Sequence, residues 1–415
     1  MIRGLGLLFL VKPVSQLNIL ILTHRVPFPQ NGGYPIVVCN TIRGLVNLGH
    51  EVSLVSLNAK KHRHQQDSDD DELLTKIKYR SFDIDTSVSL FDGIRNIFSK
   101  SSSNIDRYYN VEFEKLLIRT VRNITYDIIQ FEGLFVAPYI DGVRRNCKSK
   151  LLYRAHNMEH QIWERLAEQK GDPFKKLYLK QIARRIKRYE IQQLNKFDAI
   201  AVFTGQDKST MMLYGAVIPI EVVPVGIDLP HYLPDFSKTE FPSLFFLGSL
   251  DWMPNREGIE WFLKTFHSDL EHDELRVKFY VAGNDIPEQF DDYEVMGKIF
   301  IQGEVDNGLE FVNSKSIMIV PLLSGGGMRV KIVEGMAMQK CIISTSLGAE
   351  GINYKNGVNI LIANTRDEFF KAIRRCVADE DYCKAVGLNA RRLIEEQHDV
   401  NKVTNNLVAL YEQLL

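Results

Sequence analysis

The chain is short of cysteine, of net charge and of long hydrophobic runs, and each shortage excludes a class of protein. Its 415 residues include 5 cysteines with no CxxC pair, which argues against a disulfide framework and a structural zinc site and favours a reducing compartment. The net charge of −1 provides no general attraction for nucleic acid. The apolar run from Leu5 to Val11 is too short to span a bilayer, and no small-residue cleavage site follows it. We therefore expect a cytoplasmic protein whose first 16 residues form an extra segment of unassigned role.

The chain also lacks the GxGxxG fingerprint of nicotinamide-dependent dehydrogenases. Asn31-Gly32-Gly33 follows the first strand-like run instead, and the strand expected over 51–57 does not end in an acid that could bind a ribose. A glycine loop at the carboxyl end of a first strand still lies where open α/β sheets bind ligands. Gly32 and Gly33 therefore either approach a ligand or form a tight turn.

Strand-like and helix-like runs alternate in two series along the chain. The apolar run 17–26, helical spacing that ends at Gly49 and a second strand from Glu51 form a βαβ unit, and a comparable series starts near 243. A chain of this length exceeds one compact core. The sequence predicts an α/β protein with two doubly wound, Rossmann-like domains over 1–230 and 231–399, followed by a helix over 400–415.

The segment from Pro321 to Gly351 carries the strongest functional pattern. Gly325, Gly326 and Gly327 connect a strand expected over 316–320 to a helix whose first turn carries Arg329 and Lys331. Cations oppose the macrodipole at a helix N-terminus, and a bound phosphate removes that conflict. Glu334 lies about one and a half turns beyond Arg329, where it could accept ribose hydroxyls. The alternative is a tight connection before a solvated helix start.

Further polar residues end other predicted strands. Glu132 and His156 each follow a strand of the first half, and His156 could exchange a hydrogen bond with a sugar hydroxyl or be purely structural. Gly248 and Ser249 follow the first strand of the second half. Two DxD patterns, at 67–69 and 83–85, follow no clear strand, so we expect neither to bind a metal.

Taken together, the glycine loop with Arg329, Lys331 and Glu334 resembles that of retaining glycosyltransferases of family 4, which have the GT-B fold. The segments NGG, GLVNLGHEVSLVS, RAHNMEH, VVPVGID, FLGSLDWMPN and 345–351 extend the likeness over nearly the whole chain from Leu17. The resemblance implies an N-terminal acceptor domain, a C-terminal nucleotide-sugar domain and a last helix that packs back on the first domain. It also implies a donor site and an acceptor side. The donor site would comprise Gly248, Ser249, Gly325, Gly326, Gly327, Arg329, Lys331 and Glu334, and the acceptor side Gly32, Gly33, Glu132 and His156.

The sequence departs from the commonest pattern of that family in two places. Gly326 replaces the first of two glutamates separated by seven residues, and an arginine and a lysine usual after the first strand of the second domain are replaced near Ser249 and Glu257. Arg329 and Lys331 would then stabilise the leaving diphosphate, with His156 as a third catalytic residue and without a metal or cofactor. No carboxylate nucleophile is evident. The resemblance therefore favours attack by the acceptor on the anomeric carbon from the same face as the leaving diphosphate.

The resemblance leaves the sugar, the base and the acceptor open. We expect a glycan or lipid-linked acceptor in the biosynthesis of cell-surface polysaccharide or glycolipid. The basic run from Lys175 to Lys187 is either a face for the inner side of a membrane or a solvated helix. Two other functions remain: a sugar-nucleotide isomerase of the same fold, and a nucleotide-sugar-binding protein without activity, which the missing glutamate at Gly326 suggests.

Overall fold

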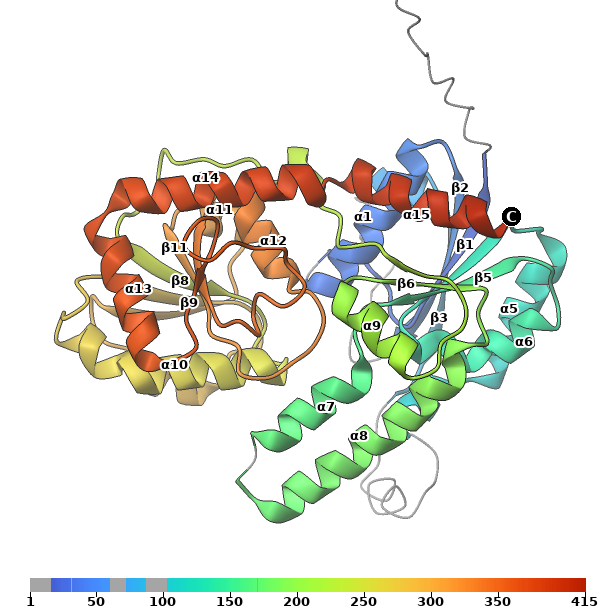
Figure 1. Ribbon diagram of the computed structural model, residues 1–415, viewed down its shortest axis with the longest axis horizontal. Coiled ribbons are helices and arrows are strands. Elements are labelled where there is room, and N and C mark those ends of the chain that lie inside the picture. Colours follow the sequence, from blue (N-terminus) through green and yellow to red (C-terminus); the bar gives the residue numbers. More distant parts are fainter. Residues whose placement is uncertain (1–15, 31, 60–71, 87–102, 170) are drawn as a thin grey trace, which may run out of the picture.

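The computed structural model describes residues 16–30, 32–59, 72–86, 103–169 and 171–415. Two parallel sheets with helices on both faces lie side by side, one in each half of the chain (Figure 1). This arrangement is the GT-B fold and confirms the predicted fold class. The division at 230 and 399 stays a prediction. The N-terminal apolar run and the first DxD pattern lie outside the described residues.

The N-terminal half is built on a seven-stranded parallel sheet in the order β3-β2-β1-β4-β5-β6-β7. Five of the six residues of β1 are buried, which is typical of a parallel strand covered on both faces. The strand order reverses between β1 and β4, and ligands of such sheets bind beyond the carboxyl ends at this point. The strands are β1 (Asn18–Thr23), β2 (Glu51–Ala59), β3 (Lys78–Ile84), β4 (Ile128–Glu132), β5 (Lys150–Ala155), β6 (Ala199–Val202) and β7 (Ile220–Val222).

Local capping explains where several helices of this half begin. The Asn110 side chain accepts hydrogen bonds from the backbone N–H groups of Glu112 and Phe113, and Asp172 does the same for the helix that starts with Pro173. The helices are α1 (Gly33–Asn47), α2 (Glu72–Thr75), α4 (Ser103–Asp106), α5 (Val111–Asn123), η2 (Leu134–Tyr139), α6 (Ile140–Arg144), α7 (Glu159–Glu168), α8 (Pro173–Leu194), α9 (Gly205–Leu213) and η3 (Leu229–His231).

The C-terminal half repeats this design with six parallel strands in the order β10-β9-β8-β11-β12-β13. Its order reverses between β8 and β11, which places the ends of these two strands at its binding edge. The strands are β8 (Ser243–Leu247), β9 (Lys278–Ala282), β10 (Ile299–Gly303), β11 (Ile317–Val320), β12 (Cys341–Ser344) and β13 (Leu361–Ile362). The helices are α10 (Met253–Glu271), η4 (Glu288–Tyr293), α11 (Gly308–Asn313), α12 (Val330–Ala337), α13 (Arg366–Ala378), α14 (Glu380–Gln397) and α15 (Val400–Leu414).

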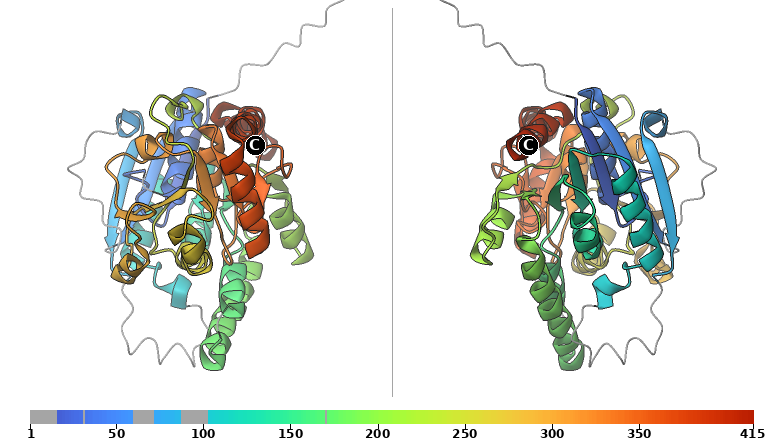
Figure 2. Two further views of the ribbon diagram at one scale, coloured as in Figure 1. Left: turned by 90° about the vertical axis from the view of Figure 1, so that its left-hand side faces the viewer. Right: turned by 90° about the vertical axis from the view of Figure 1, so that its right-hand side faces the viewer.

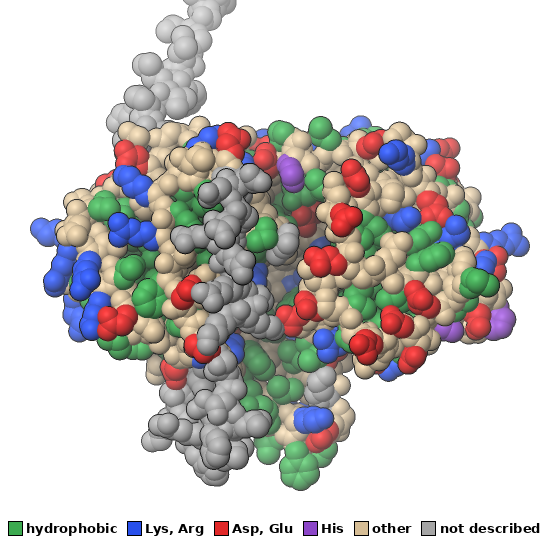
Figure 3. Space-filling view, turned by 180° about the vertical axis from the view of Figure 1, so that it is seen from behind, with side chains coloured by type: hydrophobic (Ala, Val, Ile, Leu, Met, Phe, Trp, Pro, Cys, Tyr) green, Lys and Arg blue, Asp and Glu red, His purple; other side chains and the backbone are tan. Residues whose placement is uncertain are grey.

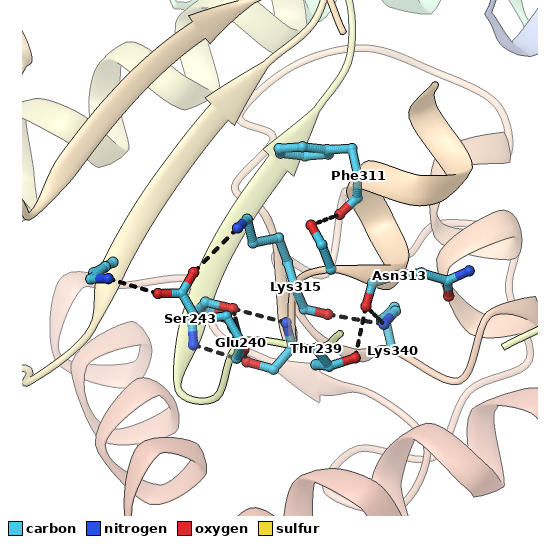
Figure 4. Close-up of polar contacts among 10 residues, drawn as sticks. Thr239, Glu240, Ser243, Phe311, Asn313, Lys315 and Lys340 are labelled. Carbon is cyan, nitrogen blue, oxygen red and sulfur yellow. Dashed lines mark hydrogen bonds and ion pairs between the residues drawn. The ribbon is translucent and has the colours of Figure 1, made fainter. Parts of the chain in front are cut away.

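A polar network fixes the opposite, amino-terminal edge of this second sheet (Figure 4). Lys340 is 1% exposed, and its Nζ donates to the backbone oxygens of Asn313 and Lys315, at 3.3 and 2.9 Å. Burial lowers the pKa of Lys340 to about 8, although Asp235 acts to raise it. Glu240 accepts hydrogen bonds from Lys278 and Lys315. Because these contacts lie before β8, β11 and β12, they hold the sheet at the end remote from the expected ligand.

Helices α14 and α15 lie end to end and cross from the C-terminal half to the N-terminal half (Figure 1). Val403, Leu407, Val408 and Tyr411 of α15 are buried against the same core as the apolar residues of β1 and α1. The last helix therefore packs on the first half.

Helices α7 and α8 form an antiparallel hairpin that extends away from the body of the protein (Figures 1 and 2). At its base, the Glu190 carboxylate accepts hydrogen bonds from the backbone N–H groups of Glu159 and His160, at 2.7 and 3.2 Å, and also bonds to the His160 ring. A carboxylate at a helix N-terminus satisfies free N–H groups and the macrodipole. Glu190 thereby fixes the direction in which α7 leaves the sheet. No helix in the described part of the chain is long and apolar enough to cross a bilayer.

Candidate active site

Arg329 lies inside the glycine loop rather than in the first turn of the helix. Helix α12 begins at Val330, so Arg329 is the residue before it, and the prediction that both cations lie in the first turn is wrong for Arg329. Its side chain is 5% exposed, and its Nη1 donates to the carbonyl oxygens of Gly326 and Gly327. Its Nε and Nη2 are buried without a hydrogen-bond partner in the described structure. Two guanidinium donors are therefore left for a ligand.

The positive φ angle of Gly327, 73°, and its surroundings explain why the loop needs glycine here. A Cβ atom at this position would overlap the side-chain oxygen of Asn157 and approach the carbonyl oxygen of His156. A Cβ atom at Gly326 would lie 3.0 Å from Ile162 of α7. The loop therefore packs directly against the segment that follows β5.

Lys331 reaches the carboxyl end of β8. Its Nζ donates to Asn255 Oδ1 at 3.1 Å, and Asn255 Nδ2 donates to the carbonyl oxygen of Ser249 at 2.8 Å. A Cβ atom at Gly248 would overlap the ammonium group, which lies 4.0 Å from the centre of the Phe246 ring. The structure thus brings Lys331 together with Gly248 and Ser249.

The ammonium group of Lys331 is buried and its charge is poorly compensated. Burial lowers the pKa of Lys331 to about 7; the nearby Glu334 acts to raise this pKa, and the Arg329 charge lowers it further. Burial also lowers the pKa of Arg329 to about 10, although Glu350 acts to raise it. Buried cations that repel each other are stabilised by a bound anion. A diphosphate would provide two negatively charged groups, one for each cation.

Glu334 has a hydrogen-bond partner that lies far from it in the chain, just after the predicted division at 230. The Tyr232 hydroxyl donates to Glu334 Oε1 at 2.7 Å. Burial raises the pKa of Glu334 to about 7, although the Tyr232 hydrogen bond and the Lys331 charge act to lower it. One carboxylate oxygen is thus engaged by Tyr232, and the other remains for a ribose hydroxyl.

The structure joins Glu132 and His156, which the sequence suggested separately. They end the neighbouring strands β4 and β5, and His156 Nε2 lies 2.5 Å from Glu132 Oε2. Glu132 is 0% exposed and its other oxygen accepts a hydrogen bond from Gln130. Burial acts to raise the pKa of the Glu132 carboxyl, but the His156 hydrogen bond and the Arg154 charge hold it below its usual value. Glu132 therefore orients His156 instead of facing an acceptor directly.

The loops of the two halves meet at this place. A Cβ atom at Gly33, in the first turn of α1, would lie 3.1 Å from the Val330 side chain, and Gly351 lies against Thr204. Gly32, with φ 99°, precedes α1 as its N-cap. Gly33, Gly326 and Gly327, predicted for the two sides of the site, thus lie at one junction between the halves.

Arg165 of α7 is a further residue of this junction. Its Nη1 donates to the Gly325 carbonyl oxygen at 2.6 Å. Its Nη1 and Nη2 also form hydrogen bonds of 2.8 Å with the two carboxylate oxygens of Glu350. The hairpin is thereby attached to the glycine loop and to the turn after β12.

Two sequence matches identify the family. Residues 31–230 match the profile described as glycosyltransferase family 4, and residues 241–379 match the profile described as glycosyl transferases group 1. The chain belongs to glycosyltransferase family 4. The predicted resemblance is confirmed, and the fold, the glycine loop and the junction between the halves can now be interpreted as parts of a glycosyltransferase.

The relatives of this glycosyltransferase are distant in sequence and similar in fold. An uncharacterised 44.6 kDa protein in the cps region of Klebsiella pneumoniae is 23% identical over 407 residues, which cover 94% of this chain and 98% of that protein. The structure of sucrose-phosphate synthase from Thermosynechococcus elongatus aligns with a TM-score of 0.70 at 15% identity, covering 96% of this chain and 99% of that one. HepE of Anabaena, solved with UDP, aligns with a TM-score of 0.64 at 12% identity, covering 96% and 100%.

Several residues of this candidate site were missed by the sequence analysis. Tyr232, Asn255 and Arg165 belong to segments far from their partners in the chain, and no local spacing marks them. The second DxD pattern was also misplaced, since Asp83 lies in β3 and Asp85 directly follows it. Asp83 accepts a hydrogen bond from Asn58 at 2.8 Å, on the edge strand of the sheet.

The cysteines are less dispersed than their spacing suggests. The thiols of Cys341, Cys376 and Cys383 lie within 4.8 Å of one another, and they form the one group with metal-ligand geometry in the described ranges. Cys341 and Cys376 are hydrogen-bonded to each other, and Cys383 donates to the backbone oxygen of Cys376. They are buried among apolar residues of β12, α13 and α14 and belong to the core of the C-terminal half.

Proposed function

We propose that this glycosyltransferase moves a sugar from a nucleotide-diphosphate sugar to a glycan or lipid-linked acceptor, with retention at the anomeric carbon. The observation that carries the proposal is the pairing of two buried, poorly compensated cations, Arg329 and Lys331, at the ends of β8 and β11. Glu334 lies about one helical turn beyond Lys331, and its carboxylate oxygen that is not engaged by Tyr232 would accept a ribose hydroxyl. The donor would therefore bind to the C-terminal half.

The reaction would depend on charge stabilisation at the leaving group. The bond from the anomeric carbon to the diphosphate oxygen breaks, and the electron pair leaves with the diphosphate. Lys331 and the two unpartnered donors of Arg329 would stabilise this growing charge, which is worth about 3 kcal/mol for one such group. No step requires a metal, because the protein supplies the cations.

His156 would act on the acceptor side of the same junction. Its ring lies at the end of β5, and Glu132 holds it by a buried hydrogen bond. The carbonyl oxygen of His156 lies next to Gly327 of the donor loop, so this strand end borders both halves of the site. No carboxylate nucleophile was identified there, and we favour attack by the acceptor hydroxyl on the face from which the diphosphate leaves.

Similar proteins support the donor class and the biological role. HepE of Anabaena was solved with UDP, and a trehalose-6-phosphate protein of E. coli was solved with UDP-2-fluoro glucose. The Klebsiella relative is encoded in a cps, or capsule, region. We infer by analogy a UDP-type donor as the first to test, and a role in cell-surface polysaccharide or glycolipid biosynthesis.

The protruding hairpin supports a peripheral membrane contact. Phe174, Leu177 and Tyr178 are 81%, 64% and 43% exposed on α8. Hydrophobic side chains gather at the free end of the hairpin in Figure 3. Exposed apolar residues followed by lysines and arginines are suited to an anionic lipid surface. A lipid-linked acceptor would be available at such a surface.

One specific observation favours a non-catalytic alternative. Gly326 stands where the family commonly has a glutamate that faces the sugar, so the chain could bind a nucleotide sugar without transferring it. Incubation with UDP-glucose, UDP-galactose and their N-acetyl forms, in the presence of an extracted lipid and glycan mixture, separates the two functions. Release of UDP with incorporation of labelled sugar supports the transferase. UDP-sugar binding without release of UDP under all these conditions supports the binding protein.

A further inference from the structure

Six aromatic and basic side chains gather beyond the carboxyl ends of β1 and β4, where the first sheet reverses its order. We refer to them as the aromatic–arginine cluster. His24 and Arg25 directly follow β1, and Phe135 belongs to η2 after β4. All six side chains are partly exposed and partly buried, as expected for the wall of a binding site. The cluster consists of His24, Arg25, Tyr34, Arg107, Tyr108 and Phe135.

The rings of the cluster form one continuous surface. The His24 ring lies 4.4 Å from the Tyr34 ring and 5.0 Å from the Phe135 ring. The Tyr108 ring lies 4.9 Å from the Phe135 ring. Aromatic faces of this kind pack against the apolar C–H face of a sugar or against a lipid chain. The ring geometry therefore favours a ligand that is more than a bare ion.

Each of the two arginines is stacked on a tyrosine and has no acidic partner among the residues that the structure describes. The Arg25 guanidinium lies 5.0 Å from the centre of the Tyr34 ring, and that of Arg107 lies 5.2 Å from the centre of the Tyr108 ring. Their Nε atoms are buried without a hydrogen-bond partner, and no carboxylate of the described residues pairs with either arginine. Burial lowers the pKa of Arg25, although Tyr34 and Tyr108 act to raise it. Partly buried guanidinium groups without a counter-ion are stabilised by an anionic ligand.

The cluster is continuous with the proposed reaction centre. The Tyr34 ring lies 4.9 Å from the His156 ring, and the Tyr34 hydroxyl donates to the Glu132 backbone oxygen at 3.3 Å. Both oxygens of the Glu132 carboxylate are already engaged, by Gln130 and His156. An acceptor bound on the cluster would thus extend from Arg25 and Arg107 toward His156.

We infer that the acceptor is an anionic sugar compound whose carboxylate or phosphate binds Arg25 and Arg107 while its ring lies on Tyr34, Tyr108 and Phe135. This inference rests on the proposed transferase function and adds the chemical class of the acceptor. A guanidinium group binds either anion through two parallel hydrogen bonds, so a uronic acid and a sugar phosphate share the required chemistry. The charge contacts would fix the acceptor on one side and leave a hydroxyl to meet His156.

The test uses three ligands that share a glucose ring and the full-length protein saturated with UDP. Methyl glucoside is neutral, its glucuronoside carries a carboxylate, and glucose 1-phosphate carries a phosphate. UDP occupies the donor site, so that glucose 1-phosphate is not bound there. Dissociation constants come from saturation-transfer NMR titrations of the wild type, R25Q, R107Q and the double variant. Arg119→Gln, which removes an exposed guanidinium group of α5, is the matched control.

We expect at least one anionic ligand to bind about tenfold more tightly than the neutral one, as a charge-assisted hydrogen bond predicts. The more tightly bound of the two anions shows whether the anionic group of the acceptor is a carboxylate or a phosphate. The double variant should lose this preference but keep its affinity for UDP. The control Arg119→Gln should keep both the preference and the affinity for UDP. Equal binding of the three ligands, binding of none, or a preference that persists in the double variant would overturn the inference. Failure of every nucleoside diphosphate to bind, with UDP the first one tested, would instead refute the proposed function.

Discussion

Arg165 and Glu350 connect the hairpin of the N-terminal half to the turn after β12 by two hydrogen bonds of 2.8 Å. The same arginine donates to the Gly325 carbonyl oxygen at 2.6 Å. One side chain therefore holds the glycine loop and fixes its position relative to the α7–α8 hairpin. This contact would transmit any displacement of the hairpin to the residues that are proposed to bind the diphosphate.

Arg165→Lys should lower the rate of sugar transfer about tenfold while the protein stays folded. Lysine keeps the charge but cannot make two parallel bonds to Glu350 and a third bond to the loop. The measurement is kcat with a UDP-sugar donor, together with the midpoint of thermal unfolding. Lys264→Gln, which removes an exposed ion pair within α10, is the control. An unchanged kcat in Arg165→Lys would show that the contact has no part in holding the loop.

Nucleotide affinity should be highest near pH 7. The pKa of Lys331 is lowered to about 7 in the free protein, so above this pH the ammonium group must regain a proton to bind a diphosphate. Affinity should therefore fall by up to about tenfold per pH unit on the alkaline side. The pKa of Glu334 is raised to about 7, so below this pH its carboxyl is protonated and accepts ribose hydrogen bonds more weakly. Calorimetry with UDP between pH 5.5 and 9 measures the decrease in affinity on both sides of pH 7, which we call the acid and alkaline limbs of the pH profile.

Two variants assign these limbs. Lys331→Arg keeps its charge and should flatten the alkaline limb, whereas Glu334→Gln should flatten the acid limb and weaken binding at pH 8. Glu350→Gln should weaken UDP binding less than Glu334→Gln does, because Glu350 is engaged by Arg165. If Glu334→Gln and Glu350→Gln have equal effects, Glu334 is not the ribose-binding residue.

Local features of the candidate site could be predicted from the sequence, whereas contacts between distant segments could not. Glycine loops, strand ends and the order of elements depend on residues that are close together in the sequence, so the GT-B fold and the loop 325–327 could be recognised. Tyr232 and Glu334 are 102 positions apart and Arg165 and Glu350 are 185 positions apart, so their pairing requires the folded chain. The buried Glu132–His156 pair needed only the adjacency of β4 and β5, which the sequence order suggests but does not establish.

His156→Ala should slow transfer by about two orders of magnitude or more and leave UDP affinity nearly unchanged. The reason is that His156 belongs to the N-terminal half, whereas Arg329, Lys331 and Glu334 belong to the other. Glu132→Gln should give a smaller loss of kcat, because glutamine can still hydrogen-bond to the His156 ring but lacks the carboxylate charge. Parallel losses of affinity and rate in His156→Ala would indicate a structural histidine.

Transfer should continue in EDTA. Arg329 and Lys331 would supply the positive charge for the leaving diphosphate, and the DxD motif in the described structure lies at the end of the edge strand β3. The experiment compares initial rates with EDTA and after addition of magnesium or manganese. Complete loss of activity that either metal restores would contradict this prediction.

The hairpin should bind anionic membranes through its free end. Phe174, Leu177 and Tyr178 project from the first two turns of α8, and the exposed cations Lys175, Lys180, Arg184 and Arg188 follow along the same helix. An anionic surface attracts each nearby cation by about 1 kcal/mol, and the apolar residues add to this by insertion. Co-sedimentation with vesicles of phosphatidylglycerol and phosphatidylcholine should therefore be strong, and should be weak with phosphatidylcholine alone.

Phe174→Ser with Leu177→Ser should reduce binding to the anionic vesicles without changing UDP affinity. Met296→Ser, at a residue that is 99% exposed in the other half, should leave both unchanged. Equal sedimentation of the wild type and the double variant would show that α8 is only a solvated helix.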